Sequence, residues 1–184
     1  MSILLKSAIL EERKKGNIII DPFDKKQLNP NSYNVKLSDT FSVLDFFRDD
    51  NGEIWDVKDH HAYYEDWIVD DNGILLLPNK LYLFGTVEYT ETHGNLVPML
   101  EGRSSLARMG LSIHMTAGFG DVGFCGNWTL ELSVIFPLRI YAGMEIGQLY
   151  WLRGEGKTKE YNGKYQHACR FEGSKIYEEF PEEA

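Results

Sequence analysis

The sequence predicts one mainly β domain, a β-barrel or jelly-roll-like sandwich that opens with a single short helix. Three observations lead to this prediction. Short apolar runs of strand length follow one another along most of the chain. Seventeen glycines among 184 residues supply turns between them. Only the first residues have the spacing of an amphipathic helix. Such a succession of strands is typical of sandwiches and barrels, and we expect residues 1–184 to form one domain.

The individual elements follow from local patterns. A helix is expected at 4–15, where apolar residues share one side and Gly16 provides the end. A single helical turn is expected at 106–111. Strands are expected at 18–20, 33–37, 41–44, 74–77, 81–89, 96–100, 128–136 and 146–151, because apolar and β-branched residues there are bounded by glycine, asparagine and proline.

Two segments depart from this pattern. Residues 45–72 are rich in charge and aromatic rings, including Trp55 and Trp67, and are expected to form an insertion within the domain. Residues 154–184 begin with a glycine- and lysine-rich loop and are expected to form a mobile C-terminal segment. Tyr161 and Lys164 in that segment could close over phosphates, or they could be solvated surface.

Composition excludes several classes of protein. No apolar run is long enough to span a membrane, and the N-terminus reaches Glu11 too soon for a signal peptide. Cys125 and Cys169 are the two cysteines, without a CxxC pair, so we expect a reducing, cytoplasmic compartment. A formal net charge of −9 argues against general nucleic-acid binding. An anionic ligand would therefore need local positive charge.

Such charge is concentrated between residues 101 and 131. Two arginines, Arg103 and Arg108, flank the hydroxyls of Ser104 and Ser105. Arginine forks match phosphate oxygens with paired hydrogen bonds, and the expected helical turn would add free backbone N–H groups at its start. The alternative is an ordinary turn with solvated arginines. We expect a polyphosphate site here.

Two carboxylates follow the arginines. Asp121 lies in a glycine-rich, hairpin-like segment, where it could cap the turn, accept a sugar hydroxyl or serve a water. Glu131 lies between Leu130 and Leu132 in an alternating strand. It is either a solvent-facing side chain or, if its face lines a pocket, a proton shuttle.

Zinc chemistry of the nucleobase-deaminase type is excluded by pattern. Such sites need an H-x-E motif and a CxxC pair, and the chain has neither. His60, His61 and His93 have no ligand-like partners at metal spacing, and His114 is expected to be a packed, hydrogen-bonded histidine. No protein-bound metal is expected.

The ordered series of these motifs resembles the dCTP deaminase branch of the dUTPase superfamily over nearly the whole chain. The Arg-Ser-Ser run and the Thr129–Leu132 strand carry the specific part of this resemblance, and the segments that match are 19–22, 29–37, 83–89, 101–111 and 129–132. The family is a homotrimer of barrel-like subunits with active sites at subunit interfaces. Its members deaminate cytosine without zinc.

The resemblance implies a role for each matching residue. Glu131 would activate a water against C4 of cytosine and pass the proton to the departing ammonia. Ser104 and Arg108 would position and polarise the reacting groups, and Asp121 would meet the deoxyribose 3′-hydroxyl. The remaining implied substrate contacts are Arg103, Ser105, Leu106 and Ala107 in the phosphate run, Thr129 and Leu130 beside the base, and Gln148, Tyr161 and Lys164. Mg²⁺ would accompany the triphosphate.

Three positions bear on the exact reaction. Ala168 stands where the family commonly has a second glutamine, and this difference concerns one phosphate contact and the preference for the triphosphate over shorter nucleotides. Gly120 stands where the family usually has an aliphatic residue. Gly118-Phe119 resembles the bifunctional members that release dUMP and diphosphate, whereas monofunctional members carry polar residues there. In a bifunctional enzyme, Asp121 would also serve the water that attacks phosphate.

The predicted function is therefore hydrolytic deamination of dCTP, in the dUMP-forming version. The alternatives are a monofunctional dCTP deaminase that yields dUTP and a dUTPase that acts only on dUTP. Glu131 argues against the last, because dUTP hydrolysis needs no carboxylate beside the pyrimidine amine. A non-catalytic nucleotide sensor is the alternative from another class, and the aromatic insertion is its support.

Overall fold

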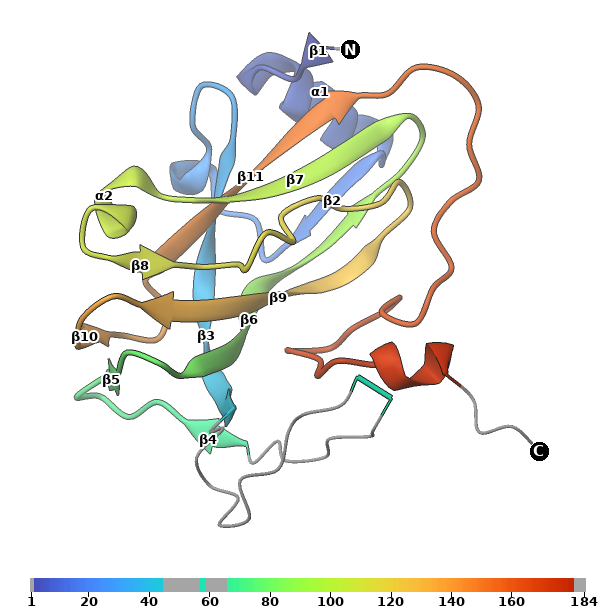
Figure 1. The fold of residues 1–184 in the computed structure, drawn as a ribbon. Coiled ribbons are helices and arrows are strands. Elements are labelled where there is room, and N and C mark those ends of the chain that lie inside the picture. Colours follow the sequence, from blue (N-terminus) through green and yellow to red (C-terminus); the bar gives the residue numbers. More distant parts are fainter. Residues whose placement is uncertain (1, 45–56, 59–65, 181–184) are drawn as a thin grey trace.

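A curled β-sheet forms the body of the protein in a computed structural model that describes residues 2–44, 57–58 and 66–180 (Figure 1). Most of the segment 45–72, expected to be an insertion, lies outside the described residues. The main sheet has nine strands. They run in the order β1-β11-β3-β6-β9-β8, with β2 paired to β6, β4 to β3 and β7 to β11. β10 and β5 pair separately. This confirms the mainly β prediction.

The elements have the following bounds. The strands are β1 (Ser2–Ile3), β2 (Ile18–Asp21), β3 (Tyr33–Leu44), β4 (Trp67–Ile68), β5 (Ile74–Leu76), β6 (Leu81–Thr92), β7 (Leu96–Gly102), β8 (Leu111–Ser112), β9 (Cys125–Val134), β10 (Leu138–Ile140) and β11 (Glu145–Arg153). The helices are α1 (Lys6–Lys15) and the single-turn α2 (Ser104–Ala107), and the 3₁₀ turns are η1 (Lys25–Gln27) and η2 (Ile176–Glu179).

Alternation along the central strands places the core. In β9 the residues at even positions from 126 to 134 are buried, while those at odd positions from 127 to 133 are half-buried on the other face. Leu130 and Leu132 meet fully buried Phe84, Tyr33 and Trp151 in the core. Each such side chain contributes roughly 1.5–3 kcal/mol of burial free energy. The register of β9 therefore fixes which of its polar side chains face outward.

Helix α1 begins two residues later than predicted. Ser2 and Ile3 pair with β11 as strand β1, and the buried Leu4 donates its N–H to the Trp151 carbonyl at 2.9 Å. The chain cannot satisfy this pairing and be helical at once. The predicted end is confirmed, because Gly16 adopts a φ of 80°, a left-handed conformation that suits glycine.

Glu12 connects helix α1 to strand β11 through a hydrogen bond. This carboxylate is 4% exposed, and it accepts hydrogen bonds from Asn17 at 2.6 Å and from Arg153 on β11 at 3.0 Å. Lys15 lies 3.3 Å from the same carboxylate. The Asn17 bond, with Arg153 and Lys15, lowers the pKa of Glu12 to about 2 despite burial.

The strands predicted at 33–37 and 41–44 are one continuous strand, β3. Polar Ser38 interrupts the apolar pattern, but the register with β6 shifts between Leu37 and Phe41, and the strand continues across the irregularity. Ser38 Oγ donates to the Thr40 carbonyl and accepts from the Gly85 N–H, so the side chain replaces part of the ladder. Strand β9 ends at Val134, two residues before the predicted end at 136.

The helical turn predicted at 106–111 lies earlier, as α2. Arg103, in an extended conformation, is its N-cap, and the Leu106 and Ala107 N–H groups both bond to the Arg103 carbonyl at 3.0 Å. Its start agrees with the expectation that Ser104 or Ser105 lies near the beginning of the turn, but the helix ends at Ala107 and Leu111 begins β8. No helix among the described residues is long and apolar enough to cross a membrane.

Candidate functional site

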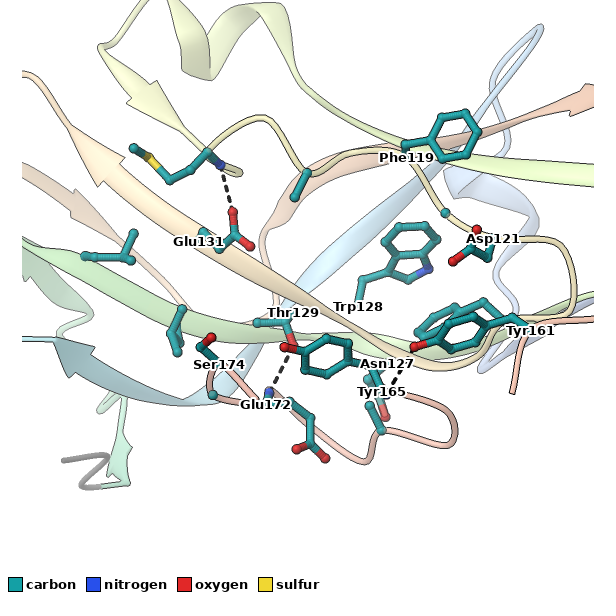
Figure 2. A pocket seen from close by; sticks show the side chains of 18 of the residues that line it. Phe119, Asp121, Asn127, Trp128, Thr129, Glu131, Tyr161, Tyr165, Glu172 and Ser174 are labelled. Atoms are coloured by element: carbon teal, nitrogen blue, oxygen red, sulfur yellow. Dashed lines mark hydrogen bonds between the residues drawn. The ribbon is translucent and has the colours of Figure 1, made fainter. Parts of the chain in front are cut away.

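A pocket of about 630 Å³ lies on the outer face of β6 and β9. The loop before β9 covers one side of it, and the segment after β11 covers another (Figure 2). Its polar walls come from three parts of the chain, and the side chains with hydrogen-bonding groups there include Asp121, Asn127, Thr129, Glu131, Tyr161, Tyr165, Glu172 and Ser174. We call this the Glu131 pocket.

Glu131 lines this pocket, half-buried, because β9 alternates. Leu130 and Leu132 turn into the core, so Glu131 must turn outward, opposite Leu83 on β6. Its Oε2 accepts a hydrogen bond from the Met115 backbone N–H at 2.8 Å (Figure 2). The carboxylate lies on a wall with one oxygen held by the backbone.

The same alternation places two neighbours beside it. Thr129 and Asn127 lie two and four residues before Glu131 on the same face of β9, and both line the pocket. The Thr129 hydroxyl accepts from the Glu172 N–H at 3.0 Å, which joins the C-terminal segment to this strand. Leu130, a predicted substrate contact, is fully buried in the core. Any contact of Leu130 with a ligand is left to its backbone.

Asp121 reaches the rim of the pocket from a loop built on glycines. Gly118 and Gly120 run beside β7, where the Leu100 N–H bonds to the Gly118 carbonyl and the Gly120 N–H to the Pro98 carbonyl. A Cβ on Gly120 would lie 2.4 Å from the Trp128 ring, and one on Gly118 would lie 2.3 Å from the Leu100 carbonyl oxygen. Only glycine fits either position. The close packing against Trp128 therefore explains why this chain has glycine at position 120, where the family usually has an aliphatic residue.

An exposed aromatic ring stands next to Asp121. Phe119 is 67% exposed and lines the pocket, although its backbone bridges to Met99 of β7. Behind it, Trp128 is buried and donates its indole N–H to Thr90 at 3.0 Å. These two rings give the pocket an apolar side opposite its polar wall (Figure 2). The sequence pattern did not identify Trp128 as a site residue, because an apolar residue at a core position of a strand gives no indication that it also lines a pocket.

The C-terminal segment forms the outer wall. Tyr161 lines the pocket, and its N–H donates to the Val122 carbonyl at 2.7 Å. Tyr165 lines the pocket too. The side-chain amide of Gln166 donates to the Gly123 carbonyl at 2.8 Å, and its Oε1 accepts from the Cys125 N–H at 3.0 Å. These bonds tie the segment to the loop that carries Asp121. Residues 161–174 thus lie against the pocket.

Lys164 does not line the pocket. Its ammonium bonds to Glu179 at 2.6 Å and to the Lys175 carbonyl at 3.2 Å, which links the segment to η2. The Glu179 carboxylate raises the pKa of Lys164. Ala168 lines the pocket instead, buried against Gly126, and its carbonyl accepts from the Asn127 N–H at 2.9 Å. A nucleotide contact of Lys164 would require exchange of the Glu179 bond.

The arginine run lies elsewhere on the same chain. None of its residues lines the Glu131 pocket, and α2 is on the opposite side of the barrel from the C-terminal segment (Figure 1). The residues in question are Arg103, Ser104, Ser105, Leu106, Ala107 and Arg108. Arg103 bonds to the Glu145 carbonyl at 2.9 Å and to its carboxylate at 3.2 Å, whereas Arg108 is exposed.

Gln148 belongs with the arginine run. It lies on β11 and donates to the Gly102 carbonyl at 3.2 Å, while its Oε1 accepts from Ser32 at 3.1 Å. We call Arg103–Arg108 with Gln148 the Arg103 cluster. The chain therefore carries cationic groups and hydroxyls on one side and a carboxylate pocket on the other.

His114 is packed and hydrogen-bonded, as predicted. It is half-buried, and its Nδ1 accepts from the Thr116 N–H at 3.3 Å while Nε2 lies 3.7 Å from Glu101. Thr116 itself has a φ of 96°, uncommon for a β-branched residue. This bent loop presents the Met115 N–H to Glu131.

Comparisons with known proteins agree with this geometry. A model of the family described as dCTP deaminase-like matches residues 3–154. The chain is 45% identical over 179 residues to a "dCTP deaminase, dUMP-forming" of Cytophaga hutchinsonii, which covers 97% of this chain and 99% of that protein. It is 46% identical over 170 residues to a protein of the same name from Leptospira biflexa, covering 92% and 93%.

A solved structure has a similar fold. The crystal structure of 2′-deoxycytidine 5′-triphosphate deaminase from Agrobacterium tumefaciens aligns with a TM-score of 0.64 at 17% identity. The alignment covers 83% of this chain and 48% of that one. At this identity the likeness concerns the fold alone, and it supports the dUTPase-like barrel.

Proposed function

Because this chain belongs to the dCTP deaminase-like family, we propose that it hydrolyses dCTP to dUMP, diphosphate and ammonia. The observation that carries the proposal is the position of Glu131, a half-buried carboxylate on a pocket wall with one oxygen held by the Met115 N–H. Two waters are consumed, one for each bond that breaks. The dUMP-forming names of the relatives favour this version over the monofunctional one.

In the first step Glu131 acts as base and then as acid. It accepts a proton from a water whose oxygen attacks C4 of the cytosine, and it returns the proton to the amine, which leaves as ammonia. The hydrogen bond from Met115 orients the carboxylate so that the other oxygen faces the water. A carboxylate placed in this way accelerates such proton transfers by about 10²–10⁴-fold.

In the second step a water attacks the α-phosphorus, and the α–β bridging oxygen leaves with diphosphate. Asp121 accepts the proton of this water, and the same carboxylate receives the deoxyribose 3′-hydroxyl. Its place on the pocket rim, ten residues before Glu131, supports both roles. Thr129 borders the base and Tyr161 the sugar, as their lining positions suggest.

The triphosphate enters as its magnesium complex and is held by the Arg103 cluster. Arg103, Ser104, Ser105 and Arg108 supply forks and hydroxyls. Leu106 and Ala107, whose N–H groups bond to the Arg103 carbonyl, form the turn that presents these groups. Ser104 and Arg108 also polarise the reacting groups. Gln148 lies beside this run through its bond to Gly102, and Lys164 approaches the phosphates when its bond to Glu179 opens.

The active site is completed between chains of a homotrimer. Within one chain the Arg103 cluster does not line the Glu131 pocket, so a neighbouring copy must bring phosphate-binding groups to it. Exposed apolar side chains support such assembly, and they include Leu75, Met109, Met115, Ile135 and Phe136, with Ile135 78% exposed. Closure between subunits would also exclude water. The two free cysteines favour a cytoplasmic location.

One assay tests the proposed function. The protein is incubated with Mg²⁺ and dCTP, and ammonia, diphosphate and nucleotides are followed together. We expect one ammonia and one diphosphate for each dUMP, without accumulation of dUTP. Accumulation of dUTP identifies a monofunctional deaminase, diphosphate from dUTP alone identifies a dUTPase, and nucleotide binding without products identifies a sensor.

A further inference from the structure

A second group of chemically reactive side chains lies outside the Glu131 pocket, where β6 ends and β9 begins. Glu91 and Cys125 are directly opposed partners in the β6–β9 pairing, and His93 follows Glu91 by two residues. None of the three lines the Glu131 pocket. Cys125 is 6% exposed, and the other two are half-buried. The sheet register itself brings a thiol, an imidazole and a carboxylate together.

The spacing of these three groups suits a metal ion. Their ligand atoms, the Glu91 carboxylate oxygen, a ring nitrogen of His93 and Cys125 Sγ, all lie within 4.8 Å of one another. In a tetrahedral zinc site, bonds of about 2.0–2.3 Å place such atoms roughly 3.3–3.8 Å apart. Small side-chain rotations at the sheet edge would close this difference.

His93 is already oriented as a metal ligand would be. Its Nε2 lies 3.0 Å from Glu91 Oε2, and its Nδ1 lies 3.2 Å from Glu160 Oε1. Metal-binding histidines commonly donate their second N–H to a carboxylate, which fixes the ring and raises its basicity. Glu160 supplies that carboxylate from the segment after β11, next to Tyr161. The ring therefore turns Nε2 toward Glu91.

We propose that Glu91, His93 and Cys125 form a binding site for a zinc-class divalent cation, with Glu160 orienting His93. Thiolate, imidazole and carboxylate are the donor set of zinc and cobalt sites, and three protein ligands leave a fourth position for solvent. Binding displaces the thiol proton, which Cys125 Sγ now directs to the Gly123 carbonyl at 3.4 Å. The expectation that His93 lacks metal-ligand partners was wrong.

The site would act as a clamp on the C-terminal segment. Glu160 reaches His93 from one side, and Tyr161 enters the Glu131 pocket on the other, so a metal-fixed imidazole anchors the start of that segment. The competing arrangement has no metal: a protonated His93 bridges Glu91 and Glu160, whose hydrogen bonds raise the pKa of the imidazole. The two arrangements differ in whether the thiol takes part.

A cobalt titration distinguishes them. The full-length protein is stripped with chelator, desalted under reducing conditions and titrated with Co²⁺. We expect one Co²⁺ per chain, the near-ultraviolet charge-transfer absorption of a cobalt–thiolate bond and visible bands of tetrahedral cobalt, all displaced by Zn²⁺. Bound Zn²⁺ should also raise Tm, and chelator should reverse the rise.

Variants assign the ligands. Cys125→Ser and His93→Gln should each lose the charge-transfer band or weaken binding at least tenfold, whereas Cys169→Ser, which changes the exposed second cysteine, should bind as the parent does. Glu160→Gln should keep the band and weaken binding about 10–100-fold, the usual range for an orienting partner. Circular dichroism checks folding, and Glu91→Gln provides a ligand variant that leaves Cys125 intact.

Two results would overturn the proposal. One is a folded parent protein that takes up no Co²⁺ with a thiolate band at concentrations up to about 100 μM, a value on the order of weak sites. The other is a band that disappears in Cys169→Ser but remains in Cys125→Ser, which places the metal at the exposed cysteine. Ammonia release from dCTP is measured separately and decides the proposed function, not this site.

Discussion

The Met115 backbone N–H donates to Glu131 Oε2 at 2.8 Å, and the Glu131 N–H donates in turn to the Ile113 carbonyl at 3.0 Å. The loop before β9 and the strand thus hold each other at the point where the carboxylate projects. Because a backbone N–H holds one of its oxygens, the Glu131 carboxylate has little freedom to change its orientation. This geometry suits a group that must both accept and release a proton.

The first prediction concerns Glu131→Gln. The amide keeps the shape of the side chain and can still accept from Met115, but it cannot take a proton from water. We expect ammonia release from dCTP to fall at least about 10³-fold, while nucleotide affinity stays within about tenfold, or 1.4 kcal/mol. Coupled ammonia assays and calorimetric titration with dCTP measure the two quantities.

Glu172→Gln is the matched control for this change. Glu172 also lines the pocket, but its carboxylate pairs with Lys175 at 2.9 Å. We expect less than a tenfold loss of turnover. Near-normal deamination by Glu131→Gln would remove Glu131 from its proposed role.

The second prediction separates the two hydrolytic steps. Asp121→Asn removes the base for the phosphate-attacking water but leaves Glu131 and its Met115 bond untouched. We expect dUTP to accumulate as ammonia continues to form, with KM raised by the weaker sugar contact. Chromatography of the nucleotides over time gives the ratio of dUTP to dUMP. A parallel loss of both products, at unchanged ratio, would contradict a separate role for Asp121.

Alternation along β9 was enough to predict how the fold presents its acid. Leu130 and Leu132 had to be buried, so Glu131 had to face outward, although the pattern left open whether that face lines a pocket. Thr129 was expected there only through the family resemblance, and Asn127 lies outside the strand predicted at 128–136. The residues that the pattern missed, such as Trp128 and Glu172, join the pocket through contacts between segments far apart in sequence. Local periodicity carries no information about such contacts.

The Glu91–His93–Cys125 group shows the same limit. Two of its members lie two residues apart, but the third is 32 residues beyond His93 and meets them only through the β6–β9 register. Strand boundaries shifted for a related reason. β3 continues through Ser38 because that hydroxyl substitutes for backbone bonds, which apolar spacing could not reveal.

A third prediction concerns stability and pH. Because bonds from Asn17 and Arg153 lower the pKa of Glu12 to about 2, from an ordinary 4.5, folding favours its charged form. That stabilisation is present above pH 4.5 and is lost as pH falls toward 2. Glu12→Gln should cost about 2–3 kcal/mol at pH 7, and the difference from the parent should shrink below pH 4.

Urea unfolding at several pH values, at one fixed protein concentration, measures this difference. Glu11→Gln is the matched control, since Glu11 is exposed and its pair with Lys15 is a surface one. The control should change stability by less than about 0.5 kcal/mol. An equal cost for the two variants would show that burial and the Arg153 bond add nothing.

The last prediction tests whether two chains share each active site. In Glu131→Gln the pocket is defective and the Arg103 cluster is intact, and in Arg108→Gln the reverse holds. If every site combines the pocket of one subunit with the arginine run of the next, random mixed trimers of the two inactive variants should regain about a quarter of the parent activity. Co-expression with two affinity tags gives such mixtures. The readout is ammonia release, and the control pair is Glu131→Gln with Glu131→Ala.

Both control variants lack the Glu131 carboxylate in the pocket, so no mixture of the control pair can assemble an intact site. The contrast between the two mixtures is therefore decisive, because both share the same subunit exchange and the same protein concentration. Recovery in the first pair and silence in the second require that the arginine run act on a neighbour's carboxylate. Silence in both, with trimers confirmed by light scattering, would mean that each chain closes its own site.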